Sequence, residues 1–367
     1  MKNKAVAVLD FGSSKISIIV GNRYPNNNFR VFATSESGYA GFVKGEFLDK
    51  EQLQDKLEEC IRNAEKQWGQ HIEKLYVGVP SEFCYNETKT YEKDYKKTTK
   101  IRQKDIDCIL NDDDDSVNVL HKNPICFSID NENIISNPIG LFAKSIKCQA
   151  SIVYVQSDFR TCILGILKKL KIRSVELVCS MLAEASYLFD AKERENGVVL
   201  IDCGYITSSV CICMGDGLLD LRSFSMGGGH ITGDIYDVMK LSFMDSESIK
   251  QNLVIGLTGT GLEFYETKTE PKSKVMVKMT NEVALARIDL IIDLIKASLK
   301  DMNYNTDNMK MYLTGGGLSY MHGIEAYMSA NLGQEIQVIV PHAINLAKPD
   351  LSSIVGLLSY AHAMENV

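Results

Sequence analysis

Two stretches of this chain share one pattern: an aspartate lies where an apolar run meets a polar turn. In the first, VAVLDFGSSKISIIV at 6–20, Asp10 follows four apolar residues and precedes the turn Gly12–Lys15. In the second, VVLIDCGYITSSVCI at 198–212, Asp202 occupies the same place. β-rich runs joined through a Gly/Ser turn are typical of β-hairpins. One such hairpin in each half of the chain predicts an internal duplication with a cleft between the copies.

The residue types in these turns suit a phosphate and its divalent cation. A carboxylate at the end of a buried strand is unfavourable unless it is paired or faces a cation. Backbone N–H groups, hydroxyls and the ammonium of Lys15 are typical phosphate donors. Because Mg²⁺ gives up its hydration shell reluctantly, we predict that Asp10 and Asp202 contact one Mg²⁺ mostly through water.

The paired hairpins resemble the phosphate loops of the actin, Hsp70 and sugar-kinase superfamily. Within it, the chain resembles the FtsA family of bacterial cell-division proteins over nearly its whole length. The resemblance rests on the order and spacing of these motifs: LDFGSSK, NPIG at 137–140, GGGHITGDI at 227–235, ESIK at 247–250 and LTGGGLSYMHGIE at 313–325.

This resemblance implies an α/β, actin-like ATPase fold. It has two duplicated lobes with mixed β-sheets flanked by helices, and an inserted α+β subdomain of the 1C type. The expected parts are the core of lobe 1 at 1–80 and 155–193, the insertion at 81–154, the core of lobe 2 at 194–232 and 305–367, and an outer subdomain of lobe 2 at 233–304.

Hydrophobic spacing also predicts individual helices. The segment after Asp49 reads as a helix that Gly69 closes. Further helices are expected at 159–170, at 181–192, from 280 onward, at 319–331 and at 351–364.

The resemblance also implies ATP with Mg²⁺ as the ligand. The residues expected to hold the phosphates are Gly12, Ser13, Ser14 and Lys15 on one side, and Gly204 and Thr207 on the other. Three glycines after a strand, Gly315, Gly316 and Gly317, are expected to border the adenosine. Gly228 opens a glycine-rich helix start whose amides suit an anion, or it belongs to a plain capping loop. Glu247 and Lys250 are expected at the ribose or base, with a surface ion pair as the alternative.

Two departures from the family pattern predict slow or absent hydrolysis, so that the chain is at most a weak ATPase. Tyr205 and Ile206 stand where FtsA-like loops carry glycines, and Ser209 stands where they carry an acid. At the position that often carries a water-positioning Glu or Gln we count Ser180, with Glu184 one turn further along. Ser180 and Glu184 are therefore the weak candidates for a catalytic role.

Expectations about partners combine the resemblance with composition. The family implies self-association into oligomers or filaments, an FtsZ-type partner whose acidic tail meets the outer subdomain, and other division proteins. By charge, the plausible contacts for that tail are Lys272, Lys274, Lys278 and Arg287. The charged runs of the insertion, including the acidic run 112–115, read more simply as solvated surface.

Composition sets the remaining bounds on function. A net charge of −7 over 367 residues argues against nucleic acid as a partner. Ten cysteines without small-scaffold spacing read as reduced thiols of a cytoplasmic protein, which the resemblance places at the division site on the inner face of the membrane through partners. No apolar run reaches about 18 residues. No basic amphipathic tail follows Met364, so we expect a chain that is not its own membrane anchor, or a truncated sequence.

Three alternatives to a nucleotide-switched division scaffold stay open. One is an assembly factor of the PilM type for a pilus or secretion machine. Another is a small-molecule kinase of the same superfamily, although no clear substrate-facing acid stands out. The last is a degenerate member that binds no nucleotide and serves only as an adaptor.

Overall fold

The computed structural model describes residues 5–24, 28–39, 41–111, 116–132, 134–256, 263–269 and 271–365. The first lobe is built on a five-stranded sheet of order β11-β6-β1-β2-β3. Its strands are β1 (Val6–Phe11), β2 (Lys15–Arg23), β3 (Phe29–Gly38), β6 (Lys74–Val79) and β11 (Ser174–Cys179). β1 pairs antiparallel with β2 and parallel with β6.

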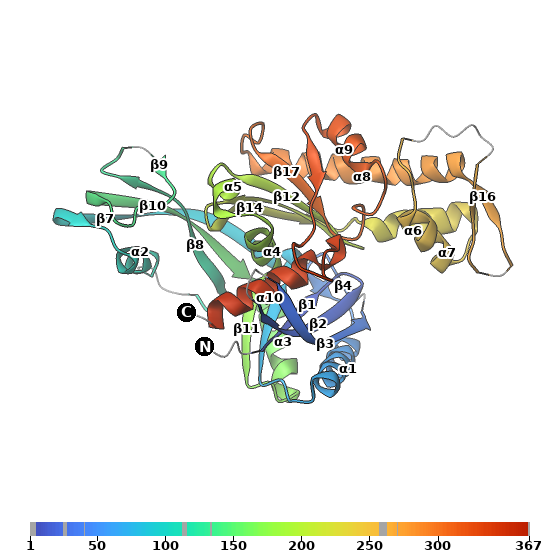
Figure 1. Ribbon diagram of the computed structural model, residues 1–367, viewed down its shortest axis with the longest axis horizontal. Coiled ribbons are helices and arrows are strands. Elements are labelled where there is room, and N and C mark those ends of the chain that lie inside the picture. Colours follow the sequence, from blue (N-terminus) through green and yellow to red (C-terminus); the bar gives the residue numbers. More distant parts are fainter. Residues whose placement is uncertain are drawn as a thin grey trace.

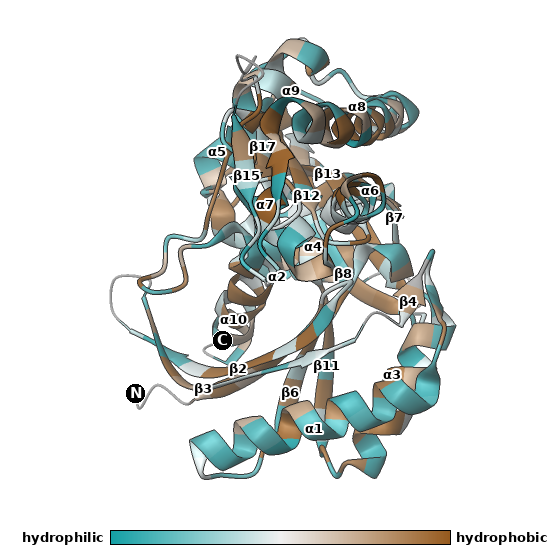
Figure 2. Ribbon diagram, turned by 90° about the vertical axis from the view of Figure 1, so that its right-hand side faces the viewer, coloured by the Kyte–Doolittle hydropathy of each residue, from teal (hydrophilic) through white to brown (hydrophobic). Residues whose placement is uncertain are grey.

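Helices α1 (Lys50–Trp68) and α3 (Ser157–Lys169) pack against this sheet through one apolar core. The predicted start and end of α1 are confirmed, because the Asp49 side chain accepts from the Gln52 N–H and Gly69 adopts a left-handed conformation with φ of 75°. Figure 2 shows the hydrophobic colouring concentrated on the strands, while the outer face of α1 is hydrophilic.

The second lobe repeats the first. Its sheet has the order β14-β13-β12-β17-β18, formed by β12 (Val198–Cys203), β13 (Ser208–Met214), β14 (Gly217–Phe224), β17 (Lys310–Thr314) and β18 (Ile336–Val338). Like β1, the strand β12 has an antiparallel hairpin partner on one side and a parallel strand on the other. Both sheets therefore share one topology, as a duplicated actin-like fold requires.

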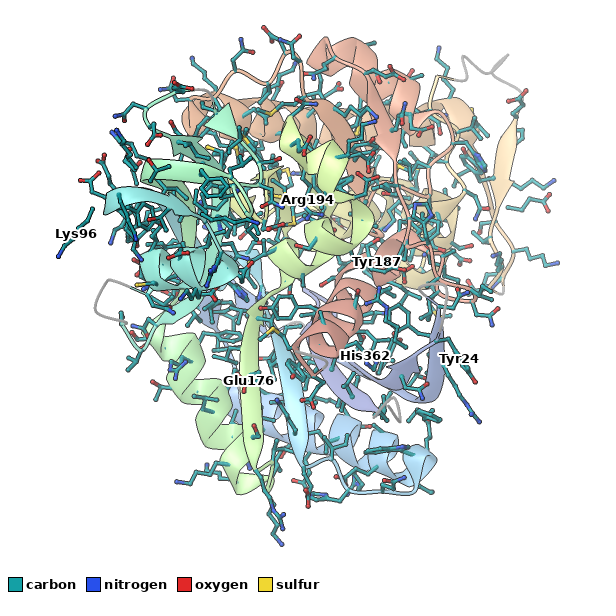
Figure 3. The ribbon with its side chains drawn as sticks, turned by 60° about the vertical axis from the view of Figure 1, so that its left-hand side comes forward. Tyr24, Lys96, Glu176, Tyr187, Arg194 and His362 are labelled. Atoms are coloured by element: carbon teal, nitrogen blue, oxygen red, sulfur yellow. The ribbon has the colours of Figure 1, made fainter. Side chains whose placement is uncertain are left out.

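A third sheet, here called the inserted sheet, has the order β7-β10-β8-β9 with antiparallel pairing throughout. It consists of β7 (Cys84–Lys100), β8 (Val119–Ile129), β9 (Ile134–Ile135) and β10 (Phe142–Val155), and α2 (Gln103–Leu110) packs on it. The polar stretch after Tyr85 is thus one long strand, and Lys96 projects from it into solvent (Figure 3). The acidic run 112–115 lies outside the described residues.

The inserted sheet is fastened to the turn between β13 and β14. The Asp216 N–H donates to the Pro124 carbonyl at 2.9 Å, and the Leu218 N–H donates to Ser151 Oγ at 3.2 Å. A Cβ at Gly215 would lie 2.1 Å from the Ile125 carbonyl oxygen, so the two backbones meet directly. Arg194, labelled near the centre of Figure 3, donates a hydrogen bond from Nε to the Gly215 carbonyl at 2.7 Å.

Further helices and short strands connect or cover these sheets. They are β4 (Phe42–Val43), β5 (Glu46–Phe47), α6 (Gly228–Met239), α7 (Phe243–Gln251), β15 (Phe264–Glu266), β16 (Lys274–Met276), α8 (Val277–Met302) and α9 (Ile324–Leu332). In Figure 1 the inserted sheet occupies one end of the long axis, and α6, α7 and β16 occupy the other. The apolar stripe of α8 is buried in the core of the second lobe, as predicted.

Three predicted helices differ from the structure. The helix expected at 181–192 is two helices, α4 (Ser180–Leu188) and α5 (Ala191–Glu195), because Asp190 is extended and caps α5. The helix expected at 319–331 begins only at Ile324, since Gly323 has φ of 82°. α8 begins three residues before the expected Thr280.

The last helix, α10 (Ser352–Glu365), packs on the sheet of the first lobe and along α4. The predicted parts had assigned 305–367 to the second lobe. α10 instead buries its apolar residues against β1 and β6, so the final segment crosses from one lobe to the other.

All ten cysteines are free thiols; Cys108 is exposed and Cys126 half-buried, whereas Cys179, Cys203 and Cys211 lie in the core.

Candidate functional site

The two hairpins meet at one cleft of about 510 Å³ between the lobes. Their tips have the same geometry: the Gly12 N–H donates to the Lys15 carbonyl at 2.9 Å, and the Gly204 N–H donates to the Thr207 carbonyl at 3.0 Å. The predicted residues that line the cleft are Asp10, Gly12, Ser13, Ser14, Lys15, Glu184, Asp202, Gly204, Glu247, Gly315 and Gly316. The predicted residues outside this lining are Ser180, Thr207, Gly228, Lys250 and Gly317.

Asp10 is held by hydroxyls from two helices. Ser353, in the first turn of α10, donates to Asp10 Oδ1 at 2.8 Å, and Ser180, at the start of α4, donates to the same oxygen at 3.3 Å. The Ser180 hydroxyl is therefore engaged in positioning Asp10.

Three carboxyl groups share the floor of the cleft. Burial raises the pKa of Asp10, and hydrogen bonds from Ser353 and Ser180 offset part of that effect. Burial and the neighbouring Asp10 charge raise the pKa of Asp202 to about 7. Burial, followed by the charges of Asp202 and Asp10, raises the pKa of Glu184 well above its usual range. An unneutralised cluster of this kind favours protons or a cation.

This donor set fits the water-mediated Mg²⁺ that the sequence predicts. Within the described ranges, no group of three His, Cys, Asp or Glu side chains is arranged to ligate a metal directly. Carboxylates that line a roomy cleft are nevertheless suited to the water shell that Mg²⁺ retains. Asp10 and Asp202 would hold those waters, and the ion would supply charge neutralisation for phosphate oxygens.

The two phosphate loops touch each other across the cleft. Ser13 Oγ accepts from the Ile206 N–H at 2.9 Å, so this amide is already engaged. The Thr207 hydroxyl is buried and makes no hydrogen bond within the described residues. A buried hydroxyl without a partner costs about 1–3 kcal/mol, and a phosphate oxygen could satisfy it.

Tyr205 occupies the place of a loop glycine and is packed rather than mobile. A Cβ on Gly229 would lie 2.6 Å from the Tyr205 ring, and the Lys250 ammonium lies 5.3 Å from the ring centroid on another side. The ring therefore forms part of the cleft wall, as the bulk of this side chain predicts.

The anion site expected at Gly228 is not available. The Gly228 N–H donates to the Gly204 carbonyl at 2.9 Å, and the Gly229 N–H donates to the Tyr205 carbonyl at 2.7 Å. The second phosphate loop thus caps the start of α6, which corresponds to the capping-loop alternative. Gly228 is also buried against Gly317, where a Cβ would meet backbone at 2.5 Å.

The three glycines after β17 divide into two roles. Gly315 and Gly316 line the cleft, whereas the Gly317 N–H donates to the Cys203 carbonyl at 2.7 Å and lies behind it. Gly315 has φ of 84°, and a Cβ there would lie 2.1 Å from Asp202 Oδ1. Side chains at Gly315 and Gly317 would displace the second hairpin.

Lys250 is buried, so the Glu247–Lys250 pair is not the surface ion pair of the alternative interpretation, and of the two residues only Glu247 lines the cleft. The Lys250 ammonium lies 2.8 Å from Glu247 Oε1 and is only 2% exposed. Glu247 also accepts from Thr232 Oγ1 at 2.5 Å and from Gln251 Nε2 at 3.0 Å. Glu247 therefore lines the cleft while both of its carboxylate oxygens accept hydrogen bonds, and Lys250, which does not line the cleft, forms the ion pair with it.

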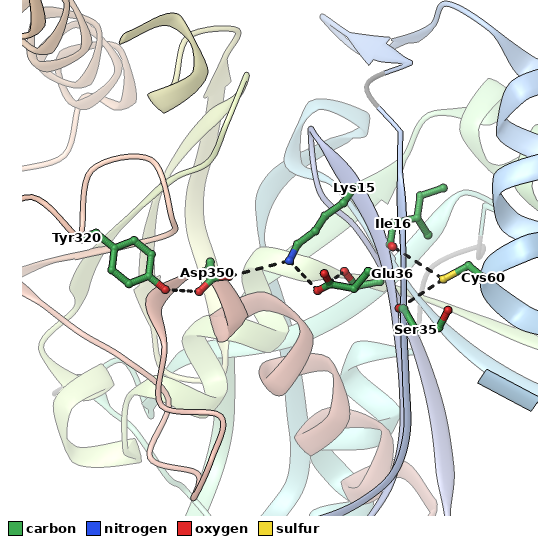
Figure 4. A network of polar contacts seen from close by, with 8 residues as sticks. Lys15, Ile16, Ser35, Glu36, Cys60, Tyr320 and Asp350 are labelled. Atoms are coloured by element: carbon green, nitrogen blue, oxygen red, sulfur yellow. Dashed lines mark hydrogen bonds and ion pairs between the residues drawn. The ribbon is translucent and has the colours of Figure 1, made fainter. Parts of the chain in front are cut away.

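The residues of one wall of the cleft were not among the site residues predicted from the sequence. This wall is formed by the start of α10 and the turn before α9, with Tyr320, Pro349, Asp350, Leu351, Ser353 and Ile354. Tyr320 donates to the Asp350 carboxylate, and Asp350 lies 4.0 Å from Lys15 (Figure 4). The sequence predicts a helix from residue 351. Its Ser353 contacts Asp10, which is 343 residues away in the chain, and no local pattern indicates that contact.

Two lobes of one topology around an acid-tipped cleft give this chain an actin-like fold. It superposes on MreB5 of Spiroplasma citri bound to ADP with a TM-score of 0.61 at 13% identity, over 99% of this chain and 98% of that one. A chain of a PilM–PilN type IV pilus biogenesis complex matches with a TM-score of 0.63 at 14% identity, over 97% of this chain and 98% of that one.

Residues 199–356 match the family model described as cell division protein FtsA. FtsA of Staphylococcus epidermidis (strain ATCC 12228 / FDA PCI 1200) is 22% identical over 381 residues, which cover 98% of this chain and 79% of that protein. The chain is thus similar to the FtsA cell-division proteins over nearly its whole length, at low sequence identity. In the part of the chain that the structure describes, every helix is too short or too polar to cross a bilayer.

Proposed function

We propose that this chain is an ATP-binding, actin-like scaffold of bacterial cell division. ATP with Mg²⁺ closes the cleft between the lobes, and the closed form self-associates head to tail. Contacts of that kind do not close on themselves and produce filaments. The oligomer then recruits division proteins through an FtsZ-type partner at the division site, on the inner face of the membrane.

The observation that carries the nucleotide part is the pairing of two equivalent Asp-tipped turns across one cleft. Its volume of about 510 Å³ lies within the usual range for small-molecule sites. The shared carboxyl cluster supports a cation in this place. The Thr207 hydroxyl, in the second turn but outside the cleft lining, makes no hydrogen bond within the described residues. We assign phosphate contacts to Gly12–Lys15, Gly204 and Thr207, and the adenosine border to Gly315 and Gly316.

We further propose that hydrolysis is slow or absent. A general base must be ionised to accept a proton, and burial next to two aspartates raises the pKa of Glu184. Bound Mg²⁺ would lower that pKa, so Glu184 is the better of the two catalytic candidates. Ser180 is occupied with Asp10. We expect turnover well below the median of about 10 per second for enzymes.

The partner site is proposed at the outer part, residues 233–304. Of the four cations suggested by the sequence, Arg287 forms a bidentate ion pair with Asp234, at 2.6 and 2.9 Å, and Lys274 pairs with Glu266 at 2.7 Å. Lys278 is exposed at the start of α8. An acidic tail would therefore meet Lys278 more readily than Arg287.

Calorimetric titration of the full chain with Mg-ATP tests the nucleotide proposal. We expect saturable binding that requires Mg²⁺ and is lost in Asp10→Asn and Asp202→Asn, while the surface variant Glu59→Gln binds as the wild type does. Absence of binding by the wild type would leave the adaptor alternative.

The PilM-type alternative shares this fold and is separated by partner, not by nucleotide. We expect the chain to bind an acidic FtsZ-type tail peptide and not a pilus-component peptide, measured by fluorescence anisotropy. The reverse preference would favour the pilus-assembly function. A turnover screen over sugars tests the kinase alternative, for which we expect no product.

A further inference from the structure

Lys15 lies at the boundary between two cavities. It lines the central cleft and also a neighbouring cavity of about 410 Å³, which Glu36 and Lys348 line as well. The Lys15 ammonium lies 2.6 Å from Glu36 Oε1 and 4.0 Å from Asp350 Oδ2 (Figure 4). Glu36, which lines the neighbouring cavity and not the central cleft, is thus the nearer of the two acids.

Both carboxylates near Lys15 are held in place by other groups. Glu36 lies on β3 opposite Ser17 of β2, and Ser17 Oγ donates to Glu36 Oε1 at 3.4 Å. Asp350, 4.0 Å from the ammonium, accepts from the Tyr320 hydroxyl. The ammonium therefore lies near acids from two separate parts of the chain, β3 and the short 3-10 helix Pro349–Leu351 that precedes α10.

A phosphate group would require the same ammonium. Lys15 follows Ser13 and Ser14 in the first phosphate loop, and it carries the full positive charge of that loop. An ammonium that is paired with a carboxylate has to be released before it can turn to a phosphate oxygen. Glu36 therefore offers Lys15 an anion that competes with the ligand.

We propose that Glu36 sets the affinity for the nucleotide's phosphates by competing with them for Lys15. This inference rests on the proposed nucleotide-binding function. The Lys15 and Glu36 side chains are 35% and 51% exposed, so the pair is screened by water and its contribution is modest. Removing the competitor should tighten nucleotide binding by about two- to fivefold.

The test is calorimetric titration of the full chain with Mg-ADP and Mg-ATP. We expect Glu36→Gln to lower Kd by about two- to fivefold for both ligands. The control is Glu73→Gln, which removes a comparable exposed acid that pairs with Arg173 at 2.9 Å and lines neither the cleft nor the neighbouring cavity. That variant should bind like the wild type.

Glu36→Asp separates pairing from simple repulsion. It keeps the charge but shortens the side chain by one methylene, so weakened pairing predicts a smaller gain in the same direction. Unchanged or weaker binding by Glu36→Gln, or a gain in Glu36→Gln with none in Glu36→Asp, would overturn the inference while the nucleotide function stands. If neither the wild type nor Glu36→Gln binds nucleotide, the proposed function fails and the inference fails with it.

Discussion

We expect protonation of the buried residue His121 to affect the cleft, although His121 does not line it. It lies on β8 of the inserted sheet and is 6% exposed. Its Nε2 accepts from the Cys179 N–H at 2.9 Å, so Nδ1 carries the hydrogen, and Nδ1 lies 3.2 Å from the Tyr360 hydroxyl. Burial lowers the pKa of His121 to about 4.

Both neighbours of His121 lie on or next to helices that position Asp10, namely α10 and α4. Cys179 directly precedes Ser180, and Tyr360 lies on α10, the helix that carries Ser353. Protonation of Nε2 would remove the acceptor for the Cys179 N–H and place a charge in the core. The start of α4 and the middle of α10 would therefore loosen together.

The magnitude follows from the two pKa values of this group. Because the folded-state pKa of about 4 lies below the ordinary value of 6.5, the unfolded chain binds the proton first, and stability is lost as the pH falls through this window. The full contribution is about 3 kcal/mol, because the folded-state and ordinary pKa values of His121 differ by about 2.5. About 2 kcal/mol of it is lost between pH 8 and pH 5.

Urea unfolding at several pH values, compared between the wild type and His121→Gln, measures this contribution. Glutamine can still accept from the Cys179 N–H but does not titrate. The variant should lose about 2 kcal/mol less than the wild type between pH 8 and pH 5. The raised pKa of Asp202 and the lowered pKa of His362 act in both proteins and cancel in the comparison. Parallel pH profiles for the two proteins would refute this reasoning.

Three further predictions concern the cleft itself. The pKa of Asp202 is raised to about 7, so the contribution of this carboxyl to stability is present below about pH 4 and is lost as the pH rises through 7. Asp202→Asn should therefore be more stable than the wild type at pH 8 but not at pH 4, as measured by urea unfolding. In Gly317→Ala the new Cβ would lie 2.4 Å from the Gly204 carbonyl oxygen, which should cost about 1–3 kcal/mol of unfolding free energy. The control Gly233→Ala, inside α6 with nothing within 4 Å, should be neutral or stabilising in the same assay. Glu184→Gln should abolish any residual phosphate release while leaving the calorimetric Kd for Mg-ATP within about twofold, and unchanged release would exclude Glu184 as the base.

The sequence was most informative where function and local structure coincide. The two acid-tipped hairpins are continuous in sequence, so their strands, their turns and the duplication could be read from about fifteen residues each. The caps of α1 were equally local, with Asp49 and Gly69 at its ends. From such signals the duplication and the residues of the two turns could be predicted, whereas the resemblance to the FtsA family implied the actin-like fold and the other predicted cleft-lining residues.

What escaped prediction depends on contacts between distant segments. Nothing near Lys250 in the sequence indicates that Tyr205 covers it, and nothing near Gly228 indicates that the second phosphate loop takes its N–H. The wall formed by α10 arises because an apolar helix crosses to the other lobe and brings Ser353 to Asp10. These are choices of tertiary packing, which a local pattern does not encode.

The seam between the inserted sheet and the β13–β14 turn limits how this molecule can be re-engineered. Position 215 leaves no room for a Cβ, and the Asp216 and Leu218 amides are committed to partners on β8 and β10. A foreign subdomain grafted between residues 81 and 154 would meet this turn with a different backbone path. Such a chimera has to bring its own matching turn, so the insertion and residues 215–218 form one exchangeable unit although they are far apart in the chain.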